Sequence, residues 1–445
     1  MGYRPSGWHC PSLRGTSTKC GGGNSKHYTL NQNMESFIAR RLYKNEQGSR
    51  KVSRPAVLIA QAGVALGLAV MLVTIAVSFG FKYEVRAKAV GFGSHLHVSN
   101  YEAGQAYESQ PIAADSALMA TLTSRDEVSH VQGYVTKPGV FRTEDDFMGY
   151  MLKGVGEDYD LSFFVQHLKE GEIPQFSSQS ISNGIVISRE MADKLQLAIG
   201  DKVDSYFLQG SLRARRYTVV GIYETGFAEY DRLFALTDLK AVQALNRWEP
   251  DQVTGVEVML TDFSEVEPMN WELGTLIDRT EDRYGERYFV QSVIDVNPGL
   301  FAWLDVLDMN VWLILSLMLG VAAFTMISGL LILILERTQL IGLLKALGAC
   351  NRSVRSIFLR FALLIVCKGM LWGNVIGLGL CAAQKFAGLI ALNPKNYYLD
   401  TVPITFEWGF IVVVNVVMFL LSALVLIVPS GLISRIHPTK AMRFE

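Results

Sequence analysis

Two histidines spaced two residues apart are the first candidates for chemistry in this chain of 445 residues. His95 and His97 fall in residues 95–99, whose β-branched content favours a strand, so both side chains would point to one face. Such a pair suits a metal ion, but a zinc site needs three or four protein ligands, and this pair has no third. An incidental pair is the simpler interpretation.

Other patterns of catalytic chemistry are missing from the sequence. No glycine directly precedes a lysine, which excludes a phosphate-binding loop of the G-x-x-x-x-G-K type. No histidine precedes a glutamate, and no G-x-S-x-G turn occurs. The acidic run RTEDDF (142–147) fits a solvated loop as well as a cation site, and His9, Cys10, Cys20 and His27 match no familiar zinc spacing. We therefore predict no catalytic residue and no metal site.

A charged break between two apolar runs, in residues 331–364, is more informative. Placed on a helix at 100° per residue, its leucines gather on one side and a nearly bare side lies opposite. The apolar side holds Leu340, Leu343, Leu344 and Leu347 with Ile341 at its edge, and the other side holds Thr338, Gly342, Lys345 and Ala346. Gly348 is placed to end this helix in a left-handed cap, and Asn351 or Ser353 to begin the next. Either a connector on the membrane surface or a docking helix for a cytoplasmic partner fits this pattern.

Four apolar stretches are long enough to cross a membrane, which takes about 20 residues. They are residues 55–81, 311–335, 361–383 and 406–428. The first is too long and too internal for a cleaved signal peptide. Lys368 and Asn374 interrupt the third, and we expect Asn374 to face protein or water, while Lys368 does the same or extends to the membrane surface.

The charges divide sharply between the long segment 82–308 and the rest of the chain. That segment holds 20 Lys and Arg against 36 Asp and Glu, whereas the chain as a whole has a net charge of −1. The cations outside it flank the apolar stretches, and short basic flanks stay in the cytoplasm. Both termini and the loop after residue 335 are therefore predicted inside, with 82–308 outside. None of the five cysteines lies in 82–308, so this domain depends on its own core.

The external segment has the pattern of a mixed α/β domain. Strands are predicted at 95–99, 184–188 and 215–225, with a further strand entered at 198–204. A helix over 188–197 has Ser188 as its expected N-cap, and a helix over 236–246 begins at Thr237 or Asp238.

Glycines at intervals of four residues recur in two of the spans. Gly63 and Gly67 lie in the first, and Gly369, Gly373 and Gly377 lie in the third. Such faces let helix backbones approach closely in lipid, although glycine is also generally common in membrane helices. We expect close helix packing at these positions.

The segment ERTQLIGLLKALGACNRSVRSIFL resembles the ER-x-x-E-I-G-x-L-K-A-L-G-A signature of FtsX-like ABC transporter permeases. The end of the chain, with Pro429, Pro438, Ala441, Arg443 and Glu445, is similar to the ending of that family. GIVISREMADKLQLAIGDKVDSYF and YTVVGIYETGFAEYDRLFAL resemble the periplasmic region of its lipoprotein-releasing permease subunits. The chain has Gln339 and Leu340 where the family usually has an acidic residue before Ile-Gly, so a salt bridge from that position is not expected.

The resemblance implies a membrane protein of four transmembrane α-helices with a large mixed α/β extracytoplasmic domain between the first and second. The implied order is a disordered N-terminal tail (1–33), a cytoplasmic interfacial helix (34–54), a first span (55–81), a periplasmic domain (82–308), a second span (309–335), a cytoplasmic coupling helix (336–350), a third span (354–385), a short periplasmic loop (386–405), a fourth span (406–428) and a cytoplasmic tail (429–445). The protein would lie in the bacterial inner membrane. Met34 is an alternative natural start.

The resemblance also implies partners and site residues. A cytoplasmic ABC ATPase dimer would bind the coupling helix and would hold the ATP and Mg, so this chain itself would carry no cofactor. The ATPase-coupling residues would be Glu336, Arg337, Gly342, Lys345, Leu347 and Gly348. The other partners would be a second permease subunit (a paralog or a copy), a lipoprotein substrate, membrane lipid and a periplasmic carrier, without nucleic acid. In the family a loop before the V-V-S/G-x-x-L-A segment binds the carrier, and here that place holds Ile173, Pro174, Gln175 and Phe176.

Two alternatives remain open at the level of sequence. One is an efflux-type or cell-division-type permease of the same family. The segment 82–308 is longer than the external domain of division-type permeases, which counts against that type. The other, of a different class, is a membrane-anchored receptor or enzyme, against which four spans and the missing catalytic motifs both count.

Overall fold

The computed structural model describes residues 35–41, 53–102, 110–144, 146–174, 176, 181–209, 211–278, 280–392, 399 and 401–430. The predicted tail 1–33, Gln175 and residues 431–445 of the predicted C-terminal tail lie outside these residues. The chain forms two compact units. The membrane unit comprises residues 1–79, 308–387 and 404–445, and the external unit comprises residues 80–307 and 388–403.

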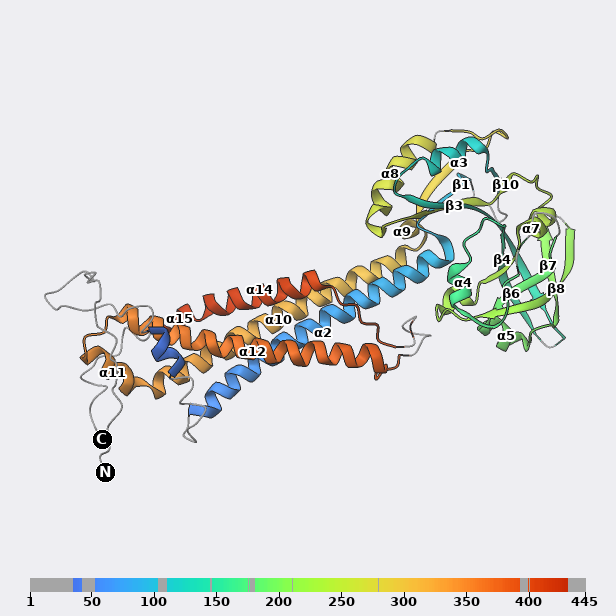
Figure 1. The fold of residues 1–445 in the computed structure, drawn as a ribbon. Coiled ribbons are helices and arrows are strands. Elements are labelled where there is room, and N and C mark those ends of the chain that lie inside the picture. Colours follow the sequence, from blue (N-terminus) through green and yellow to red (C-terminus); the bar gives the residue numbers. More distant parts are fainter. Residues whose placement is uncertain are drawn as a thin grey trace, which may run out of the picture. The chain divides into compact units, whose positions relative to one another are not determined.

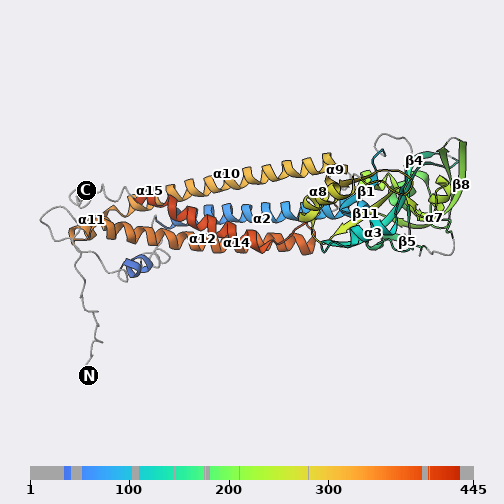
Figure 2. The ribbon, with the colours of Figure 1, turned by 90° about the horizontal axis from the view of Figure 1, so that it is seen from above.

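Four long apolar helices, side by side in Figures 1 and 2, make up the membrane unit. They are α2 (Ser53–Gly93), α10 (Pro298–Glu336), α12 (Asn351–Ala387) and α14 (Trp408–Val425). Short helices α11 (Thr338–Ala346) and α15 (Ile427–Ser430) follow α10 and α14, and residues 35–41 are also helical. The four predicted spans are confirmed, as is the mixed α/β domain between the first and the second.

The first two spans are longer helices than the sequence indicated. With 41 residues at 1.5 Å each, α2 is about 60 Å long, roughly twice the hydrocarbon thickness of a bilayer. It continues past residue 81, where the apolar run ends, because Val85, Ala89 and Phe92 bury one side of its last turns in the external unit. Likewise α10 begins at Pro298, well before its apolar run.

Glycines of α12 lie against the backbone of α2. A Cβ atom added to Gly369 would be 3.0 Å from the Gln61 carbonyl oxygen, and one added to Gly373 would be 2.9 Å from that of Ala65. One added to Gly377 would be 3.1 Å from the Cα of Ala69. The 2.9 Å separation is shorter than real Cβ contacts and the other two are tighter than most, so a larger residue at these positions would push α12 away from α2.

A second set of small residues brings α10 against α2. A Cβ added to Gly63 would overlap the Thr325 side chain, and one added to Gly67 would be 3.4 Å from the Cβ of Ala322. From the α10 side, a Cβ at Gly329 would be 2.8 Å from the Cβ of Ala60. Helix α2 therefore has close neighbours on two of its faces.

Helices α12 and α14 are joined by a reciprocal amide pair. Asn374 Nδ2 donates to Asn415 Oδ1 at 2.7 Å, and Asn415 Nδ2 donates to Asn374 Oδ1 at 3.1 Å. Each Nδ2 also reaches the carbonyl four residues earlier in its own helix, at 2.9 Å. The expectation that Asn374 faces protein is confirmed, and its amide is satisfied without water.

The external unit is built on one sheet in the order β12-β1-β11-β3-β4-β9-β6-β8-β5, with β7 paired to β3 and β8. Its strands are β1 (Leu96–Asn100), β3 (Val128–Arg142), β4 (Phe147–Val155), β5 (Leu168–Gly171), β6 (Gly184–Ser188), β7 (Lys202–Gln209), β8 (Ser211–Tyr223), β9 (Phe234–Asp238), β11 (Gly255–Leu260) and β12 (Tyr288–Ser292). The pairs β4–β9 and β6–β8 are parallel and the other pairs are antiparallel. A separate pair joins β2 (Ile112–Ala113) to β10 (Gln252–Val253).

Short helices cover this sheet, and their caps follow the sequence. They are α3 (Ser116–Thr123), α4 (Ser162–Gln166), α5 (Arg189–Leu195), α6 (Ala228–Asp231), α7 (Leu239–Asn246), α8 (Val266–Ile277) and α9 (Val293–Val296), with a 3-10 turn at Phe263–Glu265. Ser188 caps α5 by accepting a bond from the Met191 amide, and Asp238 caps α7 by accepting one from the Lys240 amide. Both predicted helix starts are confirmed.

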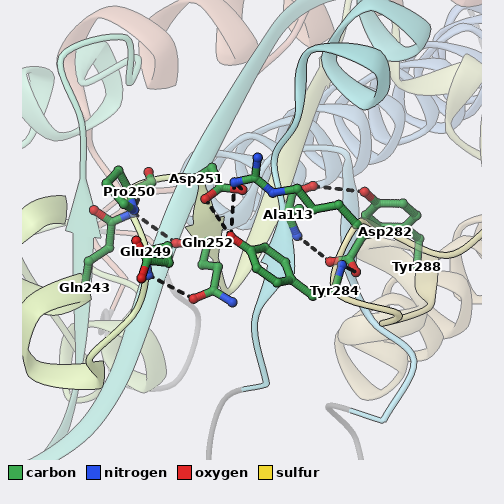
Figure 3. Close-up of polar contacts among 10 residues, drawn as sticks. Ala113, Gln243, Glu249, Pro250, Asp251, Gln252, Asp282, Tyr284 and Tyr288 are labelled. Atoms are coloured by element: carbon green, nitrogen blue, oxygen red, sulfur yellow. Dashed lines mark hydrogen bonds and ion pairs between the residues drawn. The ribbon is translucent and has the colours of Figure 1, made fainter.

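Acidic side chains at the β2–β10 pair serve the fold (Figure 3). Asp282 accepts a bond from the Ala113 amide at 2.8 Å, and the Tyr288 hydroxyl donates to the Ala113 carbonyl at 3.0 Å. Asp251 accepts from the Tyr284 hydroxyl at 3.1 Å and forms an ion pair with Arg283. These carboxylates therefore tie the 281–288 hairpin to β2 and β10.

The glycine contacts predict opposite outcomes for two alanine substitutions in α12. Gly373→Ala places a methyl group 2.9 Å from a backbone oxygen of α2, whereas Gly379→Ala meets nothing within 4 Å. We expect Gly373→Ala to lower the free energy of unfolding by about 1–3 kcal/mol, as overpacking does. Thermal unfolding of the detergent-solubilised chain measures this. Equal stability of the two variants would contradict close α2–α12 packing.

Candidate functional site: the coupling segment between α10 and α12

The coupling segment, residues 336–350, connects two long helices by a short one. Helix α10 ends at Glu336, and Arg337 leaves the helical conformation with φ −102° and ψ 18° before α11 begins. At the other end Gly348 has a φ of 94°, which an L side chain rarely adopts. The Ala349 amide bonds to the Leu344 carbonyl and the Gly348 amide to that of Lys345, both at 3.0 Å. This is a Schellman cap, so the predicted end at Gly348 is confirmed.

The sequence pattern predicts that the leucine side of α11 rests on the bilayer or on neighbouring helices and that the bare side faces the cytoplasm, and the burial of Gly342 contradicts the second part. Ile341 and Gly342 are buried, so Gly342 does not lie on an exposed bare face. Leu343 and Leu347 are 51% and 76% exposed. Gly342 thus lies on the packed side of α11, and Leu343 and Leu347 lie on the exposed side.

The exposed side of α11 is mainly apolar, and no described part of the chain covers it. Gln339, Leu343, Ala346 and Leu347 are all exposed and recur at helical spacing. Leu344, on the other side, packs against the core of the membrane unit. We name these four exposed residues the α11 stripe.

The charged residues of the coupling segment differ in their exposure. Glu336 is exposed, Arg337 is half-buried, and Lys345 is half-buried. Burial lowers the pKa of the Lys345 ammonium. The predicted coupling residues are therefore distributed around the helix, and Glu336 and Leu347 are the exposed members of that set.

The helical segment 35–41 is fastened to α12 by a charge cluster. Glu35 Oε2 accepts a bond from the Ser356 hydroxyl at 2.7 Å and lies 3.2 Å from Arg360 Nη2. Arg360 Nη1 also donates to the Ser36 hydroxyl at 2.6 Å. Ala39 is buried in the core of the membrane unit, whereas Phe37 is exposed. Sequence reasoning predicted a helix here but missed its partner, because the two groups lie more than 300 positions apart.

The carrier-loop residues lie in and beside a core of the external unit. Phe176 is buried in the apolar cluster that surrounds Phe92, and Ile173 packs against the same cluster. Pro174 is half-buried, and Gln175 lies outside the described residues. A deletion of 173–181 would therefore remove a core side chain, and it would not separate carrier contact from folding.

The two histidines are structural in their contacts. His95 Nδ1 accepts a bond from the Leu260 amide at 3.1 Å, and the His97 ring meets the edge of Tyr134. Burial lowers the pKa of each to about 4, although Asp262 beside His95 and Glu257 beside His97 act in the opposite direction. Within the described residues no three His, Cys, Asp or Glu side chains gather as a metal site would require.

Comparison with known proteins places these features in a family. A model described as "FtsX-like permease C-terminal" matches residues 312–438, which include the coupling segment. A model described as "MacB-like periplasmic core domain" matches residues 57–276. The chain belongs to the FtsX-like permeases, and it is a multi-pass ABC permease subunit with four spans and a periplasmic domain between the first two. Such a permease works with an ATPase.

Individual relatives are distant but extend over most of the chain. The lipoprotein-releasing system transmembrane protein LolC of Xylella fastidiosa (strain Temecula1) is 26% identical over 400 residues, which cover 86% of this chain and 92% of the relative. LolE of Haemophilus influenzae is 23% identical over 426 residues, which cover 91% of this chain and 98% of the relative. The macrolide export ATP-binding/permease protein MacB of Bdellovibrio bacteriovorus is 22% identical over 416 residues, which cover 87% of this chain and 59% of the relative.

The lowered pKa of His97 predicts a pH dependence of stability. The unfolded chain binds a proton near pH 6.5, which the folded state does not bind until about pH 4, so the stability contribution is complete above 6.5 and falls as the pH drops. We expect His97→Gln to unfold with a flatter pH dependence between 6.5 and 4.5 than the parent chain. His130→Gln, at a histidine on the surface, is the matched control.

Melting temperatures of the solubilised chain at a series of pH values measure these slopes. Burial raises the pKa of Asp231 to about 6, which gives an opposite slope that is the same in all three proteins. Parallel curves for His97→Gln and the parent would contradict the assigned pKa of His97.

Proposed function

We propose that this chain is the permease subunit of a lipoprotein-releasing ABC transporter in the bacterial inner membrane. The relatives named LolC and LolE support this, because their similarity runs through both the external unit and the membrane unit. In this proposal both termini and the coupling segment are cytoplasmic, in agreement with the basic flanks of the spans. The substrate is a protein held in the membrane by acyl chains.

The α11 stripe is the structural observation that supports an ATPase partner. Leu343 and Leu347 are more than half exposed among the described residues, and exposure of such apolar side chains to water is unfavourable. A separate cytoplasmic ABC ATPase dimer docks on the stripe and binds ATP and Mg. This chain is then a non-catalytic subunit, and hydrolysis takes place in the partner.

The long helices supply the path from the coupling segment to the periplasmic domain. Helix α10 runs without interruption from Pro298 to Glu336, where the coupling segment begins. Nucleotide-driven movement of α11 therefore displaces α10 and the helices packed beside it. A second permease subunit completes the transporter, and the released lipoprotein passes to a soluble periplasmic carrier.

Export of a small molecule is the second candidate function. It is favoured by the MacB-like description of residues 57–276 and by the similarity to MacB of Bdellovibrio bacteriovorus, although the chain spans 59% of that relative. The two candidates share the ATPase partner and differ in the substrate. A transport assay therefore has to offer both kinds of substrate.

Charge placed on the α11 stripe should remove the ATPase. We expect the double variant Leu343→Asp and Leu347→Asp to lose at least tenfold in ATPase affinity, because burial of each leucine contributes about 1.5–3 kcal/mol. Leu276→Asp, at an exposed leucine of the external unit, is the matched control and should bind as the parent does. Binding is measured by titration of the purified ATPase onto the solubilised chain. Undiminished binding by the double variant would exclude the stripe as the docking surface.

The same proteins test the substrate in proteoliposomes. The proposed function predicts ATP-dependent release of a triacylated lipoprotein to soluble carrier, and no release by the Leu343→Asp/Leu347→Asp variant. ATP-dependent movement of a macrolide, with the lipoprotein left in the membrane, would favour the export alternative.

A further inference from the structure

The end of α2 is enclosed by aromatic side chains of the external unit. The Phe92 ring lies 4.9 Å from that of Tyr230 and 5.3 Å from that of Phe163, measured between ring centroids. Phe164, Tyr223, Phe227 and Phe234 complete the enclosure. The last turn of α2 is thus surrounded by side chains from β8, β9, α4 and the segment 227–230.

A buried lysine donates a hydrogen bond to one of the last carbonyls of this helix. Lys153, on β4, is 3% exposed, and its Nζ lies 2.7 Å from the Phe92 carbonyl oxygen. The last carbonyls of a helix have no partner within the helix, and they carry the negative end of its dipole. A lysine ammonium at this position satisfies both the hydrogen bond and the charge.

The same ammonium is paired with a buried carboxylate. Lys153 Nζ lies 2.6 Å from Glu257 Oε1, and Glu257, on β11, is 1% exposed. The other oxygen, Oε2, accepts bonds from the Tyr159 hydroxyl at 2.7 Å and from Gln132 Nε2 at 2.9 Å. Because Gln132 is on β3, the pair connects three neighbouring strands, β11, β3 and β4.

A second lysine makes the reciprocal connection one helical turn earlier. Lys88, on α2, is buried and its Nζ donates to the Thr225 carbonyl oxygen. The turn that presents this carbonyl is fixed by Asp231, which accepts from the Thr225 hydroxyl at 2.7 Å and from the Gly226 amide at 3.1 Å. One lysine therefore reaches from the helix to the sheet unit, and the other reaches from the sheet to the helix.

A buried ion pair is weak evidence for stability, because apolar residues of similar volume often stabilise a core as well or better. What the pair provides here is a single defined position for the end of α2 relative to the sheet. Its hydrogen bonds fix the Phe92 carbonyl relative to three strands, whereas apolar packing alone would let the helix end rotate or slide.

We infer that Lys153 and Glu257 are positioning residues for energy coupling, which fix the end of α2 to the sheet so that displacement of the helix turns the periplasmic domain. This inference rests on the proposed function, since it assigns these residues to the transport cycle. The joint comprises Lys153, Glu257, Phe92 and Lys88, with Tyr159 and Gln132 holding the carboxylate.

The test is the neutral double variant Lys153→Met/Glu257→Gln, which removes both charges together and leaves neither buried alone. The matched control is Arg216→Met/Asp204→Asn, which removes the exposed, two-bond ion pair on β7 and β8. Each protein is reconstituted with the ATPase, and lipoprotein released is measured per ATP hydrolysed, together with the melting temperature.

The joint variant should hydrolyse ATP in the complex with a melting temperature near that of the parent, but release at least tenfold less lipoprotein per ATP. The control should match the parent in all three. Lys153→Arg, which keeps the charge, should restore part of the release. Unchanged release per ATP in the joint variant would overturn the inference, and so would its failure to assemble, because the pair would then serve folding. Absence of release by the parent chain would instead count against the proposed function.

Discussion

The close approach of α2 to both α10 and α12 is the constraint on which the rest of the structure depends. In lipid, helices gain little from burying apolar surface, so association relies on van der Waals contact between closely spaced backbones. The glycines of α12 and the small residues shared with α10 provide that contact. Helix α2 also contains no proline after Pro55, so no proline kink interrupts it before the turns that enter the external unit. Between Ala60 and Leu72, α2 therefore has a closely packed helix on each of two sides.

At the end of α2 the main directional contacts are polar rather than apolar. Lys153 and Glu257 are removed from water, at a cost that a fully apolar core would avoid. Their hydrogen bonds nevertheless define one position for the helix end relative to three strands. In the membrane unit, apolar packing joins α2 to its neighbouring helices. In the external unit, polar contacts set the position of its end relative to the sheet.

The positions of the helices and strands were easier to predict from the sequence than the side on which each of them is buried. Hydropathy located the four spans, and the chemistry of Ser188, Asp238 and Gly348 located helix ends, because both signals are local. The exposed position predicted for Gly342 on α11 was wrong, because a glycine gives the same pattern whether it is open to water or permits close packing. The pairing of Lys153 with Glu257 could not be predicted, since 104 positions separate them and only the sheet order brings them together. For the same reason Phe176 gave no sign that it belongs to a core.

In the proposed transporter a separate ATPase binds the exposed leucines Leu343 and Leu347 of the coupling segment. The most direct measurement is affinity purification of the unmodified chain from its native membranes, with mass spectrometry of the bound proteins and an assay of ATP hydrolysis. We expect a stoichiometric ABC ATPase that remains bound through purification and hydrolyses ATP in the complex. Recovery of the chain with its four spans intact but without any ATPase would contradict this expectation.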